Sequence, residues 1–516
     1  MSVHVYTSVP DSLTDPDSSC QPFFSAPRQC RPRASLPLAR MRAGDCLKAQ
    51  TVIGIAIIRE WIMNRAIFRE YDVRGLVETD LAPGLVEKLG RAVGTYAASH
   101  GVTTMTLGRD CRLSSDALGE AMKRGLLSTG LDVIDIGTCA TPILYFSVRH
   151  LKTGGGVMVT GSHNPPEFNG FKICVGPDTI YGGEIQRLRE IIESGAFRSG
   201  SGRAASVDIS KAYLDCIYEN VNIRPGLRVV LDGGNGVGCH FARPLFERFG
   251  CELTCLYEEM DGRFPNHHPD PTVPENLRDL ITQVRQKKAD VGIAFDGDAD
   301  RIGVVTNEGE ILWGDELLLL FSRFILKEKP GATIIGEVKC SQRLYDDIAA
   351  HGGRPIMWKA GHSLIKGKMK EEKAVLAGEM SGHLFFADRY FGYDDAIYAA
   401  ARLLEILSVT EKKLSDILAD VPRTVTTPEI RIDCPDEIKF DVVRDVTEVF
   451  RKDYRIIETD GVRILFPDGW GLVRASNTQP VLVLRFESST AESLAAIRSL
   501  TESELNRVVS RYRSKA

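Results

Sequence analysis

Short apolar runs alternate with longer amphipathic stretches from about residue 67 onward. Apolar runs bounded by turn residues are typical of buried strands, and apolar positions spaced three and four apart are typical of helices. Strands and helices that alternate in this way predict parallel or mixed sheets covered by helices. The clearest predicted strands are 103–108, 131–136, 156–160, 227–231, 291–295, 302–306 and 333–337. The clearest predicted helices are 85–99, 113–128, 184–194, 239–249 and 342–350.

The strand–helix rhythm begins three times, and the last part of the chain has a different pattern. There, predicted strands at 429–432, 461–465, 471–475 and 481–486 alternate with helices at 440–451 and 491–508. We therefore predict an α/β protein with three α/β domains of mixed sheets and a smaller α+β C-terminal domain. The predicted domains are 63–205, 206–312, 313–424 and 425–516. Residues 1–62 begin with a part rich in Ser, Pro and Arg that lacks hydrophobic periodicity, and we expect a disordered extension.

Charge and cysteine usage exclude several classes of partner. The net charge of −5 does not favour nucleic acid, because binding it usually needs a dominant basic field. The twelve cysteines are spread singly, with no CxxC pair, which is typical of reduced thiols in a cytoplasmic protein. No stretch of about 18 apolar residues occurs, so we expect no membrane association.

One serine lies in a tight polar loop that follows the predicted strand 156–160. The loop places Ser162 before His163 and ends with two prolines. The hydrolase pattern G-x-S-x-G is absent, because Asn164 stands where that pattern needs glycine. A phosphorylated serine is the sharper interpretation, since the added charge would lie near His163 and Lys172. A plain exposed loop is the alternative.

Three carboxylates follow the predicted strand 291–295 at alternating positions. They are Asp296, Asp298 and Asp300, and Arg301 comes next. An EF-hand is excluded, because its sixth position needs glycine and its twelfth needs glutamate, which this chain lacks there. Three like charges this close repel one another unless a cation lies between them. Oxygen ligands with room for a phosphate oxygen favour Mg²⁺, and a solvated acidic turn is the alternative.

Two more polar loops suit the other parts of a sugar phosphate. The loop 474–479 offers an arginine, hydroxyls and amides, and arginine binds phosphate with two parallel hydrogen bonds. The loop 378–383 alternates acid, hydroxyl and imidazole, which suits sugar hydroxyls, and 359–363 adds a further polar loop. Plain turns are the alternatives for these loops. We interpret the glycines at 233–238 as a turn that leads into a helix, and the pair His267-His268 as structural.

Five segments occur together and in one order: 68–75, the serine loop through Lys172, 296–301, 379–383 and 474–479. With this set, the chain resembles the α-D-phosphohexomutase family over residues 65–500, and most closely its phosphomannomutase/phosphoglucomutase branch. The resemblance implies four domains around a central cleft. It also implies interconversion of hexose 6-phosphate and hexose 1-phosphate, with mannose or glucose as the sugar, through a phosphoserine and a 1,6-bisphosphate.

The same resemblance assigns roles to single residues. It implies one Mg²⁺ held by Ser162, Asp296, Asp298 and Asp300. Phosphoryl transfer and proton handling would fall to Ser162, Arg74, Lys172 and His383. The substrate would be bound by Tyr71, Arg301, Lys339, His362, Glu379, Ser381, Arg474, Ser476, Asn477 and Thr478. We further expect a hexose 1,6-bisphosphate as activator, sugar phosphates as ligands, and a monomer or weak oligomer in the cytoplasm.

Other functions stay open at this point. A phosphoglucosamine mutase would use the same chemistry on another sugar. That branch tends to carry glutamine where this chain has Met380, and this difference favours mannose and glucose phosphates moderately. A non-catalytic sugar-phosphate-binding protein is less favoured, because a binder needs neither Ser162 nor the three aspartates. A phosphatase, in which water replaces the second sugar hydroxyl, is a further possibility.

Overall fold

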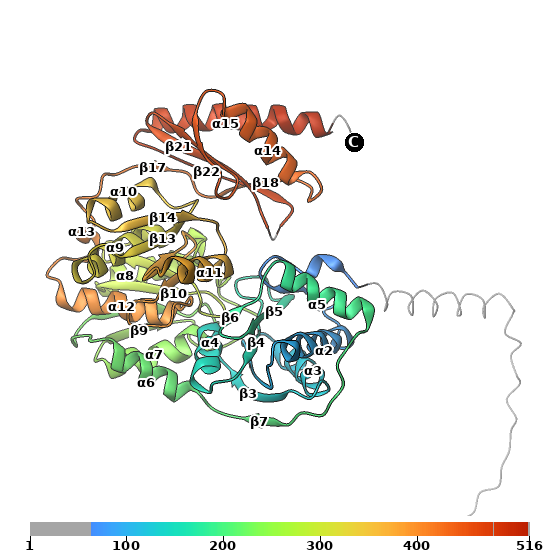
Figure 1. Ribbon diagram of the computed structural model, residues 1–516. Coiled ribbons are helices and arrows are strands. Elements are labelled where there is room, and N and C mark those ends of the chain that lie inside the picture. Colours follow the sequence, from blue (N-terminus) through green and yellow to red (C-terminus); the bar gives the residue numbers. More distant parts are fainter. Residues whose placement is uncertain (1–62, 478, 514–516) are drawn as a thin grey trace, which may run out of the picture. The chain divides into compact units, whose positions relative to one another are not determined.

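The computed structural model describes residues 63–477 and 479–513. The predicted extension at 1–62 and the predicted phosphate ligand Thr478 lie outside the described residues. The described strands form four sheets, and each sheet is built from one consecutive part of the chain (Figure 1). Within the described part, none of the helices combines the length and hydrophobicity needed to cross a membrane.

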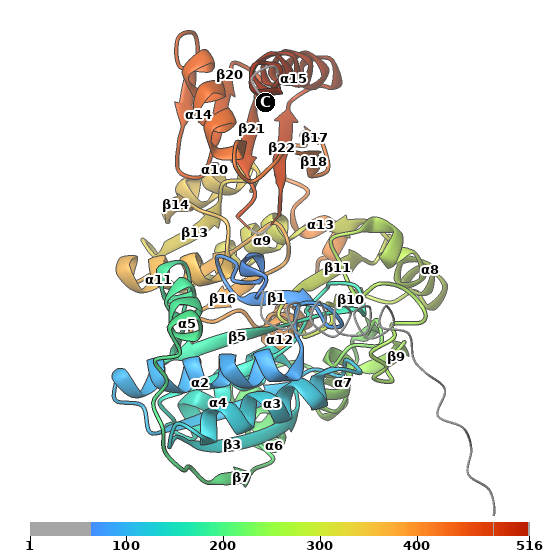
Figure 2. The same cartoon turned by 90° about the vertical axis from the view of Figure 1, so that its right-hand side faces the viewer.

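The first sheet has the order β1-β5-β4-β2-β3-β7, and β6 pairs with β5. Its strands are β1 (Val73–Leu76), β2 (Thr104–Arg109), β3 (Asp132–Thr138), β4 (Gly155–Val159), β5 (Phe168–Val175), β6 (Asp178–Thr179) and β7 (Ala204–Ser206). The helices of this part are η1 (Arg65–Ile67), α2 (Pro83–Ser99), α3 (Ser115–Leu127), α4 (Thr141–His150), α5 (Gly183–Ser194) and α6 (Ser210–Asn220). Helices α2 and α3 pack side by side (Figure 2).

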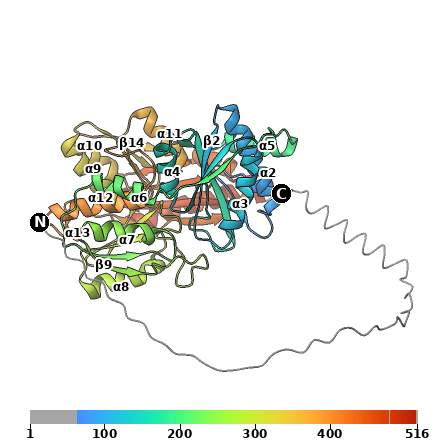
Figure 3. The ribbon, with the colours of Figure 1, turned by 90° about the horizontal axis from the view of Figure 1, so that it is seen from below.

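The second sheet has the order β12-β11-β10-β8-β9 and the third has the order β14-β13-β15-β16. The second part comprises β8 (Arg228–Asp232), α7 (Gly238–Arg248), β9 (Glu252–Leu256), η2 (Pro274–Leu277), α8 (Arg278–Lys287), β10 (Val291–Phe295), β11 (Ile302–Thr306) and β12 (Ile311–Leu312). The third comprises α9 (Gly314–Glu328), β13 (Thr333–Glu337), α10 (Gln342–Ala350), β14 (Arg354–Trp358), α11 (His362–Glu372), β15 (Leu376–Gly378), β16 (Leu384–Phe386), α12 (Ala396–Val409) and α13 (Leu414–Ile417). Helix α7 contacts both α6 and α12 (Figure 3).

The first three sheets share one topology, and this topology places the polar loops. In each sheet a central strand (β2, β8 or β13) lies between two parallel neighbours. The second of these neighbours (β4, β10 or β15) runs through a loop into an antiparallel strand (β5, β11 or β16). These three loops are the serine loop (160–167), the metal loop (296–301) and the sugar loop (379–383). The three domains are therefore related, as predicted, and each presents its polar loop at the same point of its sheet.

The fourth sheet has the order β17-β22-β21-β20-β19, and β18 pairs with β22. Its elements are β17 (Val425–Thr426), β18 (Ile430–Asp433), α14 (Lys439–Phe450), β19 (Arg455–Ile457), β20 (Val462–Phe466), β21 (Gly469–Ala475), β22 (Val481–Ser488) and α15 (Ala491–Arg513). Both helices pack on β21. This domain has a hydrophobic core of its own, whereas one larger core runs through parts of the other three. The α+β character of the fourth domain is as predicted, while the boundaries at 205, 312 and 424 stay predictions.

Candidate active site

The serine loop connects β4 to β5 and holds Ser162 in an unusual backbone conformation. Ser162 has φ of 48°, in the left-handed region that favours glycine. Its amide donates to the Thr160 hydroxyl at 2.8 Å, which fixes this turn locally. The Ser162 hydroxyl lies 3.1 Å from Nδ1 of His163 and donates to Oδ2 of Asp296 at 2.8 Å. The loop thus points its hydroxyl at the metal loop of the second domain.

The metal loop turns tightly so that its three carboxylates converge. Asp296 Oδ1 accepts the amides of Asp300 and Arg301 at 3.1 and 3.2 Å. Asp298 accepts the Thr141 hydroxyl at 2.5 Å, and its backbone carbonyl accepts the Thr141 amide. The three aspartates are fully buried, with no exposed surface. The three predicted metal ligands of the second domain are therefore brought together with the predicted reactive serine of the first domain.

One lysine neutralises part of this negative charge. Lys172 on β5 lies 2.7 Å from Asp298 and also contacts Asp300. Burial favours the neutral form of Asp298, but the Lys172 ammonium and the hydrogen bonds from hydroxyl groups together outweigh this and hold the pKa of Asp298 below its ordinary range. Burial raises the pKa of Asp296 well above its ordinary value, and the charges of Asp298 and Asp300 raise it further. A bound cation would relieve the repulsion that raises the pKa of Asp296, so the cluster retains a capacity for cations.

Two carboxylate oxygens give a direct test of whether a cation fits here. Oδ1 of Asp298 and Oδ1 of Asp300 are buried and make no hydrogen bond to the described residues. Unpartnered buried oxygens are costly unless something else binds them. Oxygen atoms of all three aspartates lie within 4.8 Å of one another. The donor set is made of hard carboxylate oxygens, which suits Mg²⁺, so the residues fit the metal that the sequence predicts.

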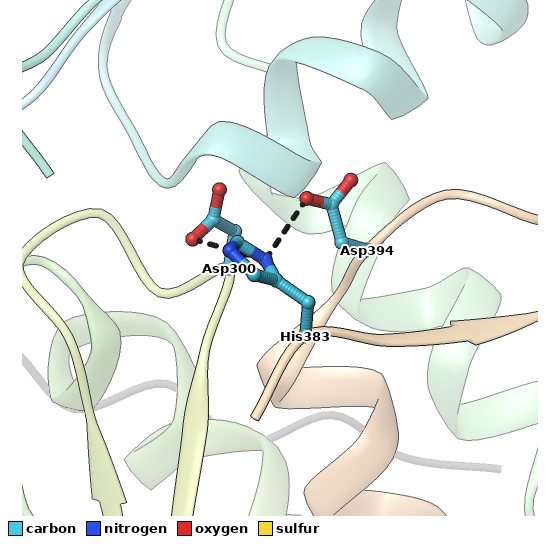
Figure 4. A group of neighbouring side chains, drawn as sticks. All are labelled: Asp300, His383 and Asp394. Carbon is cyan, nitrogen blue, oxygen red and sulfur yellow. Dashed lines mark ion pairs between the residues drawn. The ribbon is translucent and has the colours of Figure 1, made fainter. Parts of the chain in front are cut away.

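His383 lies at the end of the sugar loop, between two aspartates (Figure 4). Its Nδ1 is 3.2 Å from Asp394 and 3.6 Å from Asp300. Its Nε2 accepts a hydrogen bond from Nε of Arg301 at 2.9 Å. Asp300 already belongs to the cluster of three aspartates, and Lys366 lies 3.1 Å from Asp394. We therefore interpret this group as an imidazole oriented by carboxylates and not as a second metal site.

The sugar loop and two neighbouring segments supply hydrogen-bonding groups around His383. Glu379 is buried and its Oε1 has no partner among the described residues, which leaves that oxygen for a ligand. Ser381 is partly exposed in the same loop. The ring of His362 stacks on that of His383 at 5.8 Å between centroids. Lys339, in the loop after β13, pairs with Glu429 of the fourth domain at 3.2 Å.

The phosphate loop of the fourth domain (474–479) is fixed by charged residues that bind its backbone and its arginine. Arg474 lies 2.9 Å from Asp460, which also accepts the Ala360 amide of the third domain at 3.2 Å. Buried Lys439 donates to the backbone carbonyls of Ser476 and Gln479 at 2.5 and 3.0 Å. Because Lys439 binds these carbonyls, the side chains of the loop stay available to bind an anion. The loop therefore has the character of a phosphate site.

One tyrosine links three domains at this point. The Tyr71 hydroxyl donates to the Ala360 carbonyl at 2.9 Å and accepts from Nδ2 of Asn477 at 2.9 Å. In the same segment, Arg74 pairs with Asp72 at 2.5 Å and donates to the Asn164 side chain at 3.0 Å. The predicted site residues that the structure describes thus lie in or next to the serine, metal, sugar and phosphate loops.

Sequence reasoning missed several residues that these contacts single out: Asp394, Asp460, Lys439 and Glu429. The partner that each of them binds in the site lies outside its own sequence neighbourhood, so local spacing does not reveal its role. Only Asp394 carries a signal, because it belongs to an acidic pair that precedes α12. The second acid of that pair, Asp395, caps the helix by accepting the Tyr398 amide at 2.9 Å.

The two patterns interpreted as structural have structural partners. His267 Nε2 lies 3.1 Å from both carboxylate oxygens of buried Asp232, and its Nδ1 lies 2.9 Å from the His268 carbonyl oxygen. The glycine-rich segment after β8 leads into α7, which begins at Gly238. Both interpretations agree with the contacts found.

Family models match the chain along nearly all of the described residues. The matches are to the phosphoglucomutase/phosphomannomutase α/β/α domains I (65–199), II (211–309) and III (313–425), and to the C-terminal domain of the same family (429–501). The four models follow one another in family order, and each contains one of the four polar loops.

Individual relatives agree with the family models. The phosphomannomutase/phosphoglucomutase of Pseudomonas aeruginosa is 48% identical over 448 residues, which are 86% of this chain and 96% of the relative. The probable phosphoglucosamine mutase of Methanopyrus kandleri is 36% identical over 433 residues, 83% of this chain and 94% of the relative. A crystal structure of a phosphoglucomutase/phosphomannomutase family protein from Burkholderia thailandensis has a TM-score of 0.82 at 40% identity, and covers 87% of this chain and 98% of its own. The chain belongs to the phosphoglucomutase/phosphomannomutase family.

Proposed function

We propose that the protein interconverts hexose 6-phosphates and hexose 1-phosphates of mannose and glucose, with Ser162 as the phosphoryl carrier. The observation that supports this most is the convergence at Ser162: its hydroxyl lies 2.8 Å from one of three buried aspartates. A remote cationic loop around Arg474 would hold the other end of the sugar phosphate. This arrangement suits phosphoryl transfer, which depends on positioning and charge neutralisation.

The proposed reaction has two transfers that balance each other. In the first, the bond from phosphorus to Ser162 Oγ breaks and a bond to a sugar hydroxyl forms, which gives a hexose 1,6-bisphosphate. The bisphosphate then turns around in the site. In the second, the other phosphate moves back to Ser162 Oγ, and the sugar oxygen that it leaves takes up a proton. A hexose 1,6-bisphosphate supplied from outside would act as activator, because it phosphorylates Ser162.

Geometry supports one of the three candidates for proton handling more than the other two. Lys172 is held by two carboxylates and Arg74 by Asp72, so both act as fixed positive charges. In His383, Nδ1 lies beside Asp394 and Nε2 accepts a hydrogen bond from Arg301. When Arg301 binds a phosphate instead, Nε2 becomes free to exchange a proton. We propose His383 as the group that takes the proton of the sugar hydroxyl in the first transfer and returns it in the second.

Four residues would hold the divalent cation: Ser162 as its phosphorylated form, Asp296, Asp298 and Asp300. Bound Mg²⁺ would neutralise charge on the transferring phosphoryl group. Asp298→Asn removes one charge from this set, so we expect a lower affinity for Mg²⁺ and a much lower rate. Titration of the rate with Mg²⁺ measures both effects, and an unchanged half-saturating concentration contradicts the assignment.

The distal phosphate would lie against Arg474, Ser476 and Asn477, with Thr478 in the same loop. Glu379, Ser381, Lys339 and His362 would contact sugar hydroxyls, and Tyr71 would close the site through its bonds to the third and fourth domains. Binding at a point far from the reacting phosphate orients the substrate without taking part in the chemistry.

A coupled assay tests the proposed function. Mannose 1-phosphate, glucose 1-phosphate and glucosamine 1-phosphate are supplied separately with Mg²⁺ and a catalytic amount of 1,6-bisphosphate. We expect turnover of the first two and little of the third. Turnover of glucosamine 1-phosphate alone would support the phosphoglucosamine alternative, and binding without turnover would support a sugar-phosphate sensor.

We also propose a cytoplasmic location and a monomer or weak oligomer. The nine cysteines in the described part of the chain are all free thiols, which supports a reducing compartment.

A further inference from the structure

We propose that Arg112 is a positioning residue: it fixes the backbone of the serine loop and so places Ser162 for phosphoryl transfer. The proposal rests on the function proposed above. Arg112 belongs to the loop that follows β2 and lies fifty residues before Ser162 in the sequence. Apart from the Ser162 carbonyl, its side-chain hydrogen bonds within the described residues go to none of the residues assigned to metal, sugar or distal phosphate.

The Arg112 guanidinium donates to four backbone carbonyls, three in the serine loop and one at the start of β5. Nη2 donates to the carbonyl of Ser162 at 2.7 Å and to that of Asn164 at 2.5 Å. Nη1 donates to the carbonyl of Pro165 at 2.7 Å and to that of Phe168 at 3.0 Å. One cation therefore gathers carbonyls along the whole loop, including the carbonyl of the reactive serine.

Asp110 completes this arrangement by binding an amide of the same loop. Its Oδ2 lies 3.2 Å from Nε of Arg112 and accepts the Gly161 amide at 3.2 Å. Its Oδ1 accepts the hydroxyl of Ser115 at 2.5 Å. The residue before Ser162 is thus held by the carboxylate, while Ser162 itself is held by the guanidinium.

Such support is needed because Ser162 adopts a conformation that costs energy. A non-glycine residue in the left-handed region is disfavoured, and Ser162 has φ of 48°. Strained residues persist only where their surroundings determine them. When the carbonyl of Ser162 is drawn to Arg112, its hydroxyl can point the other way, toward Asp296 at 2.8 Å.

The guanidinium is enclosed, which excludes a direct role in binding substrate. The Arg112 side chain has no exposed surface. The Phe264 ring of the second domain lies 5.0 Å away from it. On the loop side, a Cβ placed on Gly161 would come within 2.6 Å of the guanidinium carbon. Arg112 therefore acts through the serine loop and not on the phosphate.

Arg112→Lys tests the proposal because it keeps the charge and removes the planar fork. Lysine offers three donors from a single atom and cannot reproduce four bonds from two nitrogens. We expect kcat to fall about 100-fold, the scale of a small misplacement near the reacting atoms. We expect KM for the sugar phosphate to stay within about threefold, since the phosphate and sugar loops are untouched. The rate at which 1,6-bisphosphate phosphorylates Ser162, followed by intact mass, should fall with kcat.

The matched control is Arg402→Lys, a buried arginine paired with Asp388 at 3.1 Å and remote from the serine loop. We expect this variant to keep kcat. A second test leaves Arg112 in place. Gly161→Ala adds a methyl group that would clash with the Arg112 guanidinium, so it should also lower kcat. Circular dichroism and thermal unfolding establish that each variant is folded.

The outcomes separate this proposal from the proposed function. The positioning role is wrong if wild type is active and folded Arg112→Lys has a kcat within about threefold of the wild-type value. A loss confined to KM overturns it as well. If Arg112→Lys does not fold, Gly161→Ala decides, and unchanged kcat in that variant overturns the role. Wild type that turns over none of the sugar phosphates overturns both proposals together.

Discussion

Gly297 lies where the metal loop meets the serine loop, and its lack of a side chain is what permits their contact. A Cβ added at this position would lie 2.4 Å from the Ser162 carbonyl oxygen. The backbone of Gly297 is outside the left-handed region, so alanine is compatible with its conformation and introduces only the steric conflict. Gly297→Ala is therefore a clean test of how closely the two loops must approach.

The size of the effect follows from the distances. Ordinary van der Waals contact begins at 3.4 Å, so the two loops must separate by about 1 Å. A displacement of about 1 Å near the reacting atoms costs about 100-fold in rate, or about 2.7 kcal/mol in activation free energy. Overpacking at a buried contact costs about 1–3 kcal/mol of folding stability.

The assay compares kcat of wild type, Gly297→Ala and Gly84→Ala at saturating sugar phosphate, Mg²⁺ and 1,6-bisphosphate. Gly84 lies in α2, where an added Cβ has no heavy atom within 4 Å, so it provides a matched control. We expect kcat to fall about 100-fold in Gly297→Ala and to stay unchanged in Gly84→Ala. If folded Gly297→Ala retained kcat within about threefold of wild type, close approach of the two loops would not be required for the reaction.

Three further predictions concern the fourth domain. Lys439→Met removes the ammonium that binds two phosphate-loop carbonyls, so steady-state kinetics should show KM raised about tenfold, whereas an increase in KM below twofold would contradict this. Asp460→Asn removes the charge that orients Arg474, so it should raise KM, but less than Arg474→Ala does. Equal KM values for wild type and Arg474→Ala would refute the assignment of Arg474 to the distal phosphate. Lys339 holds the pKa of Glu429 at about 2, below its ordinary value of 4.5. The pairing of Glu429 with Lys339 therefore stabilises the fold fully above pH 4.5. This stabilisation is lost as the pH falls through about 2. Urea unfolding should therefore show Glu429→Gln less stable than wild type by about 1–3 kcal/mol at pH 7 and by clearly less at pH 3, and a difference independent of pH would refute the coupling.

The sequence predicts the strands that carry the polar loops because their apolar runs end abruptly at polar residues. The segment 291–295 is an example: it forms β10 and is buried at every position. Helices that are buried on most sides are harder to predict, because they lack the polar face that gives a helical period. Helix α12 illustrates this, since eleven of its residues are buried, Arg402 among them.

Some residues of the site can likewise be predicted from a local sequence pattern, and others cannot. Ser162 and the three aspartates are marked by their spacing in short loops. Arg112 and Lys439 act on backbone carbonyls of residues far along the chain, and a backbone carbonyl has no sequence signature. Their roles emerge only when the fold brings distant segments together.

Phosphorylation of Ser162 is the central claim, and mass spectrometry tests it most directly. Wild type is incubated with hexose 1,6-bisphosphate and Mg²⁺, and its intact mass and phosphopeptides are measured before and after addition of excess sugar monophosphate. We predict a single phosphoryl group on Ser162 that is lost to the added substrate, and no phosphorylation in Ser162→Ala. Sustained turnover by enzyme that carries no phosphoryl group on Ser162 at any stage would contradict the account.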